Sequence, residues 1–595
     1  MRSFQACNGV LLLALGVSGS NYDTSNSAGL ANSQILNDPF PYYFPPQDAS
    51  PARLFAMSRC QGVDIEEASI DELQKYLASG ELTSVQLVTC YIQRHLQTAQ
   101  YLNSVLELNP DVLSIAAILD QERSNGQVRS ALHGIPFLVK DNIGSKDKMQ
   151  TTAGSWALQG SIIPRDAHVV RQMRKAGAVL MGKATLSEWA DMRSNNYSEG
   201  YSGRGGQARS SYNFTVNPGG SSSGSAISVS NNVVTFALGT ETDGSIINPA
   251  ERNAIVGIKP TVGLTSRAGV IPESEHQDTV GAFGKTVRDA VYALGIIYGV
   301  DARDNYTAAQ VGKTPKDGYT QYLANSTALK GAKFGIPWKS FWKKADAHQL
   351  AVLLEMVDMV EKAGATIVNG TELPHWREIV SPDYWNWDYG TSRGFPNESE
   401  YTYIKVDFYN NIATYLSEVS NTDMKSLHDL VRYNNENIGS EGGWPNVHPA
   451  FGSGQDGFLA SLATGGVQNE TYWQALEFCH RTTREEGIDA ALHHDGHNLD
   501  ALLVPPDVAQ SYQIAAQAGY PVITIPASVH PLSGMPFGLA FMGTAWSEAT
   551  LIKYASATED LMISSGSQYQ RAKTPPTWDG YLERNIPTAP QCAGC

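Results

Sequence analysis

The sequence predicts an α/β protein in which α-helices cover both faces of a largely parallel or mixed central β-sheet. Segments with helical periodicity alternate with short strands over most of the chain. The predicted strands are almost wholly apolar, as at residues 135–139 and 501–504, which is typical of strands buried on both faces. No internal repeat or low-complexity linker divides the chain, so the alternation belongs to one folded unit.

Composition narrows the possible function classes. The 595 residues include 43 Lys and Arg against 59 Asp and Glu, which gives a formal net charge of −16. Hydrophobic residues make up 42% of the chain and supply a core, while 17% charged residues is too low for a disordered chain. An acidic protein lacks the cationic surface that binds nucleic acid or anionic lipid. We therefore expect a globular protein without a nucleic-acid partner or membrane attachment.

Capping boxes mark the first predicted helices. Ser69 and Glu72 open a helix that ends at Gly80, a second box at residues 83–86 opens the next, and Pro110 starts a third. Beyond these, the periodicity predicts a helix at 169–175 and strands at 135–139, 178–181, 233–238, 501–504 and 522–525.

The start of the chain predicts export. A positively charged residue precedes a short apolar run at residues 10–17, so residues 1–20 are interpreted as a signal peptide cleaved near Gly19 or Ser20. That run is too short to cross a bilayer. Residues 21–60, rich in Asn, Ser, Asp and Pro, are expected to form an N-terminal extension over the surface. Seven glycosylation sequons also fit a secreted protein, and they begin at Asn196, Asn213, Asn305, Asn325, Asn369, Asn397 and Asn469.

Cysteine usage agrees with an oxidising compartment. Without the signal peptide the chain keeps Cys60, Cys90, Cys479, Cys592 and Cys595, and we expect one or two disulfides among them. The terminal pair can tie the tail to the body of the protein. Because no second CxxC or His pair stands at ligand spacing, the sequence predicts no metal site there.

A lysine closes the first buried strand. Lys140 follows apolar residues 135–139, and burial at such a position disfavours the charged amine. A pKa near 7 requires burial to lower it from about 10.4. Because adjacent strand residues point to opposite faces, Asp141 is not expected to oppose that change. The alternative is a lysine that extends from the strand end into solvent.

Two serine-containing turns complete the candidate site. Residues 217–226 hold Ser221 and Ser222 just before a predicted helix, where backbone amides and the helix dipole favour negative charge. Residues 238–246 place Ser245 at the carboxyl end of a predicted strand, with small residues that let backbone amides converge. A flexible loop and a tight turn are the plain alternatives.

In this order, these segments resemble the amidase signature family. Its pattern is a lysine after a Gly-Ile-Pro strand, a Gly- and Ser-rich loop, a Gly-Thr-Asp turn and a Gly-x-Lys-Pro-Thr segment. Here these correspond to Lys140, 219–225, 239–246 and 257–261. The likeness runs from about residue 65 to 300 and resumes at 502–506 and 519–521. It implies the amidase-signature fold.

The resemblance also implies a mechanism. Ser245 is the nucleophile, Lys140 is the base, and Ser221, held on a cis peptide bond after Gly220, bridges them. Ser222 is a supporting hydrogen-bond partner. The oxyanion hole consists of the backbone amides of Thr242, Asp243, Gly244 and Ser245. The protein is then an amidase that cleaves a small-molecule amide through an acyl-serine intermediate, without cofactor or metal.

Two departures from the family pattern leave substrate preference open. A single glycine precedes Ser245 where a pair is commonest, and Ile247-Asn248 stand where many members carry arginine. A role as the A subunit of the glutamyl-tRNA amidotransferase is disfavoured by the signal peptide and by the net charge of −16.

Two competing functions remain open. Residues 220–224 also match the G-x-S-x-G elbow of α/β-hydrolases, which would make Ser222 the nucleophile of a secreted esterase with a partner such as His530. A catalytically silent secreted glycoprotein is the other alternative. His133 is interpreted as a structural residue and not as the base.

One amidase domain is expected over residues 61–575, followed by a tail at 576–595. Within it, an aromatic-rich excursion lies around residues 371–470. One hypothesis is that its aromatic residues line the acyl pocket, and simple packing is the alternative. The residues concerned are His375, Trp376, Tyr384, Trp385, Trp387 and Tyr389.

Overall fold

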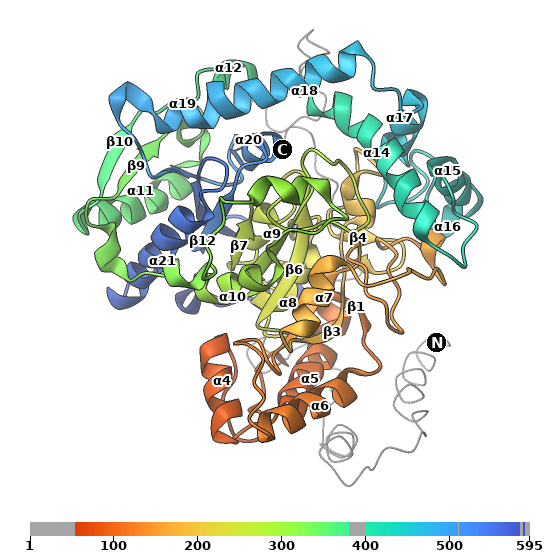
Figure 1. Ribbon diagram of the computed structural model, residues 1–595, viewed down its shortest axis with the longest axis horizontal. Helices are drawn as coiled ribbons and strands as arrows, with labels where there is room; N and C mark the ends of the chain where they lie inside the picture. Colours follow the sequence, from red (N-terminus) through yellow and green to blue (C-terminus); the bar gives the residue numbers. More distant parts are fainter. Residues whose placement is uncertain (1–53, 380–398, 510, 584–586, 589–595) are drawn as a thin grey trace.

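The computed structural model describes residues 54–379, 399–509, 511–583 and 587–588, and its centre is an 11-stranded sheet (Figure 1). The strands are β1 (Val105–Leu108), β2 (Pro136–Lys140), β3 (Val179–Ala184), β6 (Phe236–Glu241), β7 (Val256–Lys259), β8 (Thr279–Gly284), β9 (Lys333–Ile336), β10 (Thr366–Asn369), β11 (Ala501–Val504), β12 (Val522–Val529) and β13 (Pro536–Met542). Their order is β1-β3-β2-β6-β8-β7-β12-β13-β11-β9-β10. A separate ribbon pairs β4 (Tyr201–Ser202) with β5 (Gly206–Gln207).

The sheet is mixed, as the sequence predicts. At one end β2 runs parallel to both β3 and β6, and at the other β9 runs parallel to β10 and β11. The strands between these two groups pair antiparallel. Two parallel groups therefore flank an antiparallel centre.

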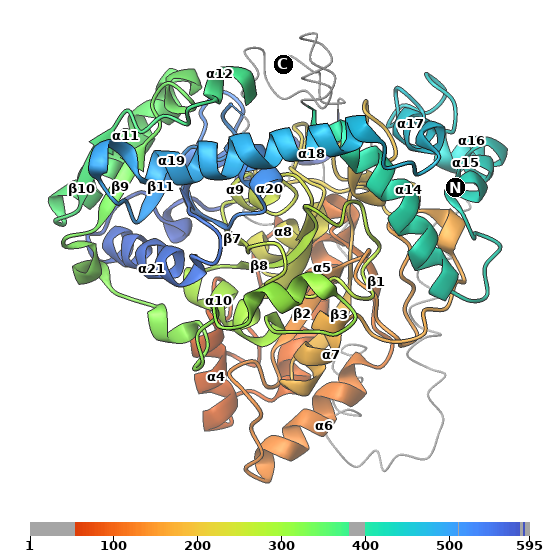
Figure 2. The ribbon, with the colours of Figure 1, turned by 45° about the horizontal axis from the view of Figure 1, so that its top comes forward.

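Helices surround this sheet (Figure 2). At the end where the described chain begins lie α4 (Ile70–Ser79), α5 (Ser84–Leu102) and α6 (Val112–Ser124). One packed set consists of α7 (His168–Lys175), α10 (Val287–Ile297) and α21 (Glu548–Ser564), and another of α8 (Ser223–Ser230) and α9 (Ile247–Glu251). Further along the chain follow α11 (Ala347–Lys362), α12 (Trp376–Ile379), α14 (Glu400–Glu418), α15 (Leu427–Glu436), α16 (Ile438–Glu441), α17 (Asp456–Thr464), α18 (Glu470–Thr483), α19 (Asp489–Leu492) and α20 (Ser511–Ala518).

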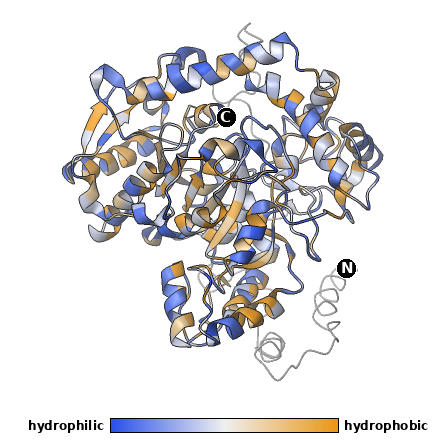
Figure 3. Cartoon of the chain, in the orientation of Figure 1, coloured by the Kyte–Doolittle hydropathy of each residue, from blue (hydrophilic) through white to orange (hydrophobic). Residues whose placement is uncertain are grey.

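Burial shows that both faces of the sheet are covered. Every residue of β2, β3, β6, β7 and β8 is buried. Because strand side chains alternate between faces, complete burial requires packing on both sides. The edge strands β1 and β10 are only partly buried. Figure 3 shows the hydrophobic colouring concentrated on the central strands.

Local signals placed the first helices correctly. Ser69 and Thr83 form the predicted capping boxes of α4 and α5, and Gly80 ends α4 in the left-handed conformation. The strand predicted at 233–238 is displaced, because β6 begins at Phe236. Val233 and Val234 are buried in the loop after α8, and hydrogen bonding to β8 extends the strand to Glu241.

The helices α14, α15 and α17 of the excursion, together with α18, share a second core cluster with residues from the segment 153–192. Figure 1 shows α18 lying across the top of the molecule, and Figure 2 shows it crossing the front after the top has been turned forward. This cluster also holds Cys479, which is buried. In the described ranges no helix is long and apolar enough to cross a bilayer.

The cysteine expectations are met in part. Cys60 and Cys90 form a disulfide with their Cα atoms 5.7 Å apart. Cys592 and Cys595 lie outside the described residues, as do the predicted signal peptide and most of the N-terminal extension. The beginning of the tail packs on the end of the N-terminal extension and on the body, because Trp578 stacks on Phe55 with ring centroids 3.7 Å apart and lies 6.1 Å from the ring of Phe214.

Candidate active site

The structure brings Lys140, Ser221 and Ser245 together in one hydrogen-bonded chain. Lys140 Nζ donates to Ser221 Oγ at 2.6 Å, and Ser221 Oγ donates to Ser245 Oγ at 2.9 Å. Lys140 and Ser221 are fully buried, and Ser245 is 4% exposed. Only the last group in the chain is therefore open to a substrate.

Three different elements position these side chains. Lys140 is the last residue of β2, Ser221 lies in the loop before α8, and Ser245 lies between β6 and α9. The Gly220–Ser221 peptide bond is cis. Backbone bonds join the loops, since Ser187 N–H donates to the Ser221 carbonyl at 3.1 Å and Ser222 N–H to the Ser245 carbonyl at 3.3 Å.

The Lys140 side chain has three acceptors, which match the three N–H donors of its protonated form. Besides Ser221, Nζ contacts Thr240 Oγ1 at 3.0 Å and the Thr240 carbonyl at 3.3 Å. Burial lowers the pKa of Lys140 from 10.5 to about 8. At that value a substantial fraction of the amine is neutral in weakly alkaline solution. The apolar strand before Lys140 was the signal in the sequence, and it predicted a lowered pKa, which is the direction found.

Four buried or half-buried carboxyl groups oppose this shift. Glu273, Asp191, Glu199 and Asp278 all raise the pKa of Lys140, against the larger effect of its burial. Their own pKa values are raised, in each case chiefly by burial. Sequence reasoning missed all four, because none of them stands in a recognisable motif.

Asp141 is not among these groups. Its carboxylate accepts from Thr152 Oγ1 at 2.6 Å and from the Gly154 amide at 3.1 Å, while Lys140 is bonded to Ser221 and Thr240. Adjacent residues at the strand end thus serve different networks, as alternation predicts.

The turn before Ser245 is held rigidly. Glu241 accepts the Ile246 and Ile247 amides at 2.7 and 3.0 Å. Gly244 has φ +75°, and a Cβ there would lie 2.5 Å from the ring of Tyr512. Glycine is therefore required at this position both by conformation and by space.

A pocket opens in front of Ser245 and contains about 470 Å³ of space not filled by protein. Its wall includes Thr242, Asp243, Gly244 and Ser245, whose backbone is the predicted oxyanion hole. The remaining lining residues are Ala190, Asp191, Tyr197, Glu199, Gly220, Asn248, Glu273 and Tyr512. Of the departures noted in the sequence, Asn248 lies in this wall, and its Oδ1 accepts the Gly220 amide at 3.3 Å.

Among the described residues, Tyr197 and Tyr512 supply the aromatic rings of this pocket, and neither was singled out by the sequence. Trp376 lies in α12 against the main core. The hypothesis for Tyr384, Trp385, Trp387 and Tyr389 concerns residues outside those described.

The geometry argues against Ser222 as a nucleophile. Ser222 Oγ donates to the Thr240 carbonyl at 3.0 Å, and the side chain is fully buried. A nucleophile elbow needs a strand directly before it, and residues 208–222 form none. His530 pairs with Asp346 at 3.2 Å. These observations argue against the esterase alternative.

His133 has a structural role at the opposite end of β2. Its Nε2 is 2.9 Å from the Leu119 carbonyl, its side chain is fully buried, and burial lowers its pKa. This agrees with the interpretation of His133 as a structural residue.

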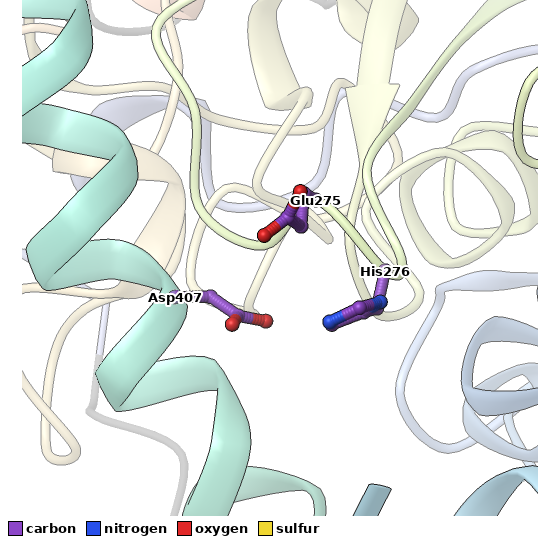
Figure 4. Close-up of side chains that lie close together, drawn as sticks. All are labelled: Glu275, His276 and Asp407. Atoms are coloured by element: carbon purple, nitrogen blue, oxygen red, sulfur yellow. The ribbon is translucent and has the colours of Figure 1, made fainter. Parts of the chain in front are cut away.

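A second cluster of polar groups contains Glu275, His276 and Asp407 (Figure 4). Both ring nitrogens of His276 are hydrogen bonded, to Tyr472 Oη and Tyr306 Oη, each at 2.8 Å. Asp407 accepts from Ser274 and Tyr472 at 2.6 and 2.7 Å. Because these atoms are already engaged, we interpret the cluster as a hydrogen-bond network that joins α14 and α18 to the loop before β8.

Comparisons with known proteins agree with this geometry. A model of the family named Amidase matches residues 86–437, which is more than half of the chain. A Schizosaccharomyces pombe protein that carries an amidase name is 56% identical over 97% of both chains, and one of Arabidopsis thaliana is 39% identical over 84% of this chain and 91% of its own. The crystal structure of peptide amidase from Stenotrophomonas maltophilia is 37% identical, with a TM-score of 0.75, over 87% of this chain and 99% of its own. The chain belongs to the amidase signature family and is an amidase.

Proposed function

We propose that this protein hydrolyses carboxylic amides through an acyl-Ser245 intermediate, with Ser221 and Lys140 as its proton relay. The observation that carries the proposal is the unbroken contact from Lys140 Nζ through Ser221 Oγ to Ser245 Oγ, at 2.6 and 2.9 Å. Serine is a weak nucleophile unless a base removes its proton, and the lowered pKa of Lys140 makes its amine available as that base.

The relay accounts for both halves of acylation. As Ser245 Oγ attacks the carbonyl carbon, its proton passes to Ser221 Oγ while the Ser221 proton passes to neutral Lys140 Nζ. In the reverse direction, the protonated Lys140 returns a proton through Ser221 to the leaving nitrogen, and the C–N bond breaks. Water then attacks the acyl ester with the same relay as base, which releases the carboxylic acid and restores Ser245.

The backbone amides of the turn from Thr242 to Ser245 stabilise the oxyanion of the tetrahedral intermediate. All four residues line the pocket in front of Ser245. Such donors act in a buried site with little reorganisation, and removing one costs about 10²- to 10³-fold in kcat in serine hydrolases.

The decisive test is labelling with a fluorophosphonate probe and location of the adduct by mass spectrometry. We expect a single adduct on Ser245, lost in Ser245→Ala. An adduct on Ser222 in the wild-type protein would contradict the assignment. The absence of any adduct, together with no turnover of any amide, would favour a catalytically silent protein.

Substrate choice is addressed by a panel of aliphatic, aromatic and peptide amides. Peptide amides belong in the panel because the related S. maltophilia enzyme is named a peptide amidase. We propose a small-molecule or peptide carboxamide as substrate. Hydrolysis of esters alone, with every amide left intact, would contradict the proposal.

We also propose that the enzyme is exported. The disulfide between Cys60 and Cys90 supports this, since such bonds persist in oxidising compartments. Five sequon asparagines are exposed and open to glycosylation, at Asn196, Asn305, Asn325, Asn369 and Asn469.

Expression of the full chain in a secreting eukaryotic host should give glycosylated enzyme in the medium, with a new N-terminus near residue 20. Retention inside the cell with residues 1–20 intact would contradict export.

A further inference from the structure

The peptide group between Thr242 and Asp243 is held from outside the pocket. The Thr242 carbonyl accepts a hydrogen bond from Gln277 Nε2 at 3.0 Å. This peptide bond is trans, so its carbonyl and the Asp243 N–H point in opposite directions. Because Asp243 lines the pocket beside Ser245, the bond to Gln277 directs the carbonyl away and leaves the amide facing the reaction site.

Gln277 itself has a fixed orientation. It is fully buried, and Nε2 also donates to Glu400 Oε2 at 3.1 Å, while Oε1 accepts from the Tyr403 hydroxyl. A carbonyl oxygen can only accept, so the nitrogen of the side-chain amide must face Thr242. Rotation of that amide would break all three bonds inside a buried site, which is costly.

The anchor for Gln277 lies on the excursion. Glu400 is the first residue of α14 and is 2% exposed, and its second oxygen accepts from Gln513 Nε2. The Thr242 side chain is held separately, by a 2.6 Å bond to Asp278 of the loop before β8. The residue before the Asp243 amide is thus fixed at both its carbonyl and its side chain.

We propose that Gln277 is a positioning residue, which orients the Asp243 backbone amide toward the oxyanion. Through Glu400, this orientation depends on the position of α14. The inference rests on the proposed amide hydrolysis. An oxyanion donor is effective only when it lies within about 3 Å of the oxyanion. A rotated peptide group would therefore stabilise the transition state less, while the binding of the substrate would change little.

The test compares Gln277→Met with Gln513→Met in the full chain. Both remove an amide that bonds Glu400, and only Gln277 also bonds the Thr242 carbonyl. We expect Gln277→Met to lower kcat by about 10- to 100-fold, with KM within about 2-fold of wild type. A trifluoromethyl ketone analogue of the best substrate should lose affinity by the same factor. Gln513→Met should keep kcat within about 3-fold of wild type, by the same argument.

Two results would overturn the proposal. One is a kcat for Gln277→Met within 2-fold of wild type at unchanged thermal stability. The other is an equal loss in Gln513→Met, which would make docking of Glu400 the cause. If Gln277→Met does not fold, Gln277→Asn replaces it, because its side chain is too short to reach both Thr242 and Glu400. We expect the same loss of kcat and the same small change in KM for that variant.

A second readout separates this inference from the proposed function. The rate at which a fluorophosphonate modifies Ser245 also depends on the oxyanion hole and needs no known substrate. We expect it to fall in Gln277→Met and not in Gln513→Met. A wild-type protein without labelling at Ser245 would refute the proposed function, whereas normal labelling in Gln277→Met would refute only the role of Gln277.

Discussion

The catalytic half of the sheet and the excursion contribute to the active site in different ways. Strand β2, the loop before α8 and the turn after β6 supply Lys140, Ser221 and Ser245, the groups proposed to exchange protons. The excursion supplies Glu400 and Tyr403 of α14, which both bond Gln277, and Glu400 also bonds the side chain of Asp243. The two proposals together predict that the chemistry comes from short local motifs, whereas the alignment of the oxyanion hole depends on a helix that is distant in the sequence.

The largest expected effect is at the nucleophile. Ser245→Ala should lower kcat by about 10⁴-fold or more, because it removes the hydroxyl that ends the relay and lines the pocket. Ser222→Ala is the control, since Ser222 donates to the Thr240 carbonyl and not to the relay. Initial rates on the best amide measure both variants. A greater loss in Ser222→Ala than in Ser245→Ala would reverse the assignment.

Lys140→Met should come next, with a loss of about 10²- to 10⁴-fold in kcat, since it removes the base. Lys183→Met is matched to it, because Lys183 is also fully buried, on the neighbouring strand β3, and its pKa is also lowered to about 8. Lys183 bonds Thr151 and the Ile143 carbonyl outside the relay. Equal losses of kcat in the two variants at equal thermal stability would show that the loss is not specific to Lys140, which would contradict its role as the base.

The pH profile sharpens the role assigned to Lys140. Because its folded-state pKa is lowered to about 8, the neutral base is scarce at pH 6 and abundant above pH 8. We expect kcat/KM to rise through pH 8 and then level off. Glu273→Gln removes a carboxylate that raises the pKa of Lys140, so the rising limb should move to lower pH. A limb unchanged in Glu273→Gln would contradict this electrostatic account.

A smaller effect is expected at the turn. Gly244→Ala forces a side chain into φ +75° and places Cβ 2.5 Å from Tyr512, so kcat should fall about tenfold as the turn moves. Gly295→Ala in α10 is the control, because a Cβ there meets nothing within 4 Å. Steady-state kinetics and melting temperatures distinguish the two variants. Wild-type kcat in Gly244→Ala would show that the turn tolerates displacement.

The smallest effect on activity is expected far from the pocket. Removing the Cys60–Cys90 disulfide, which closes a separation of 30 residues, should lower the free energy of unfolding by about 3 to 4 kcal/mol. Denaturant unfolding of Cys60→Ser/Cys90→Ser measures this, and kcat at 25 °C should not change. A large loss of kcat in a folded double variant would mean that this region contributes to the site.

Much of the fold was predictable where signals are local. The capping boxes at Ser69 and Thr83 determine helix starts within one turn, so α4 and α5 begin where expected. β6 was misplaced by three residues because Val233 and Val234 are apolar without being in a strand. Their burial comes from packing after α8, and a hydrophobic run does not distinguish a buried loop from a buried strand.

The residues of the candidate site also divide into those that the sequence predicted and those that only the structure revealed. Lys140, Ser221 and Ser245 stand in motifs whose order along the chain could be recognised. Asp191, Glu199, Glu273 and Gln277 could not be found, because a single acidic or amide residue in a loop carries no periodic signal. Their importance appears only when burial and proximity to Lys140 or Thr242 are known.

By itself, the sequence determined the α/β class, the first helix boundaries, the family resemblance and the residues proposed for catalysis, because each depends on neighbours within a few positions. Only the tertiary structure decided the strand order, the antiparallel centre of the sheet, the lining of the pocket and the contact from α14 through Gln277 to the turn before Ser245. These features join segments more than a hundred residues apart, such as Gln277 and Glu400. Burial and hydrogen bonding between distant segments arise from the packed chain as a whole, and no local pattern encodes them.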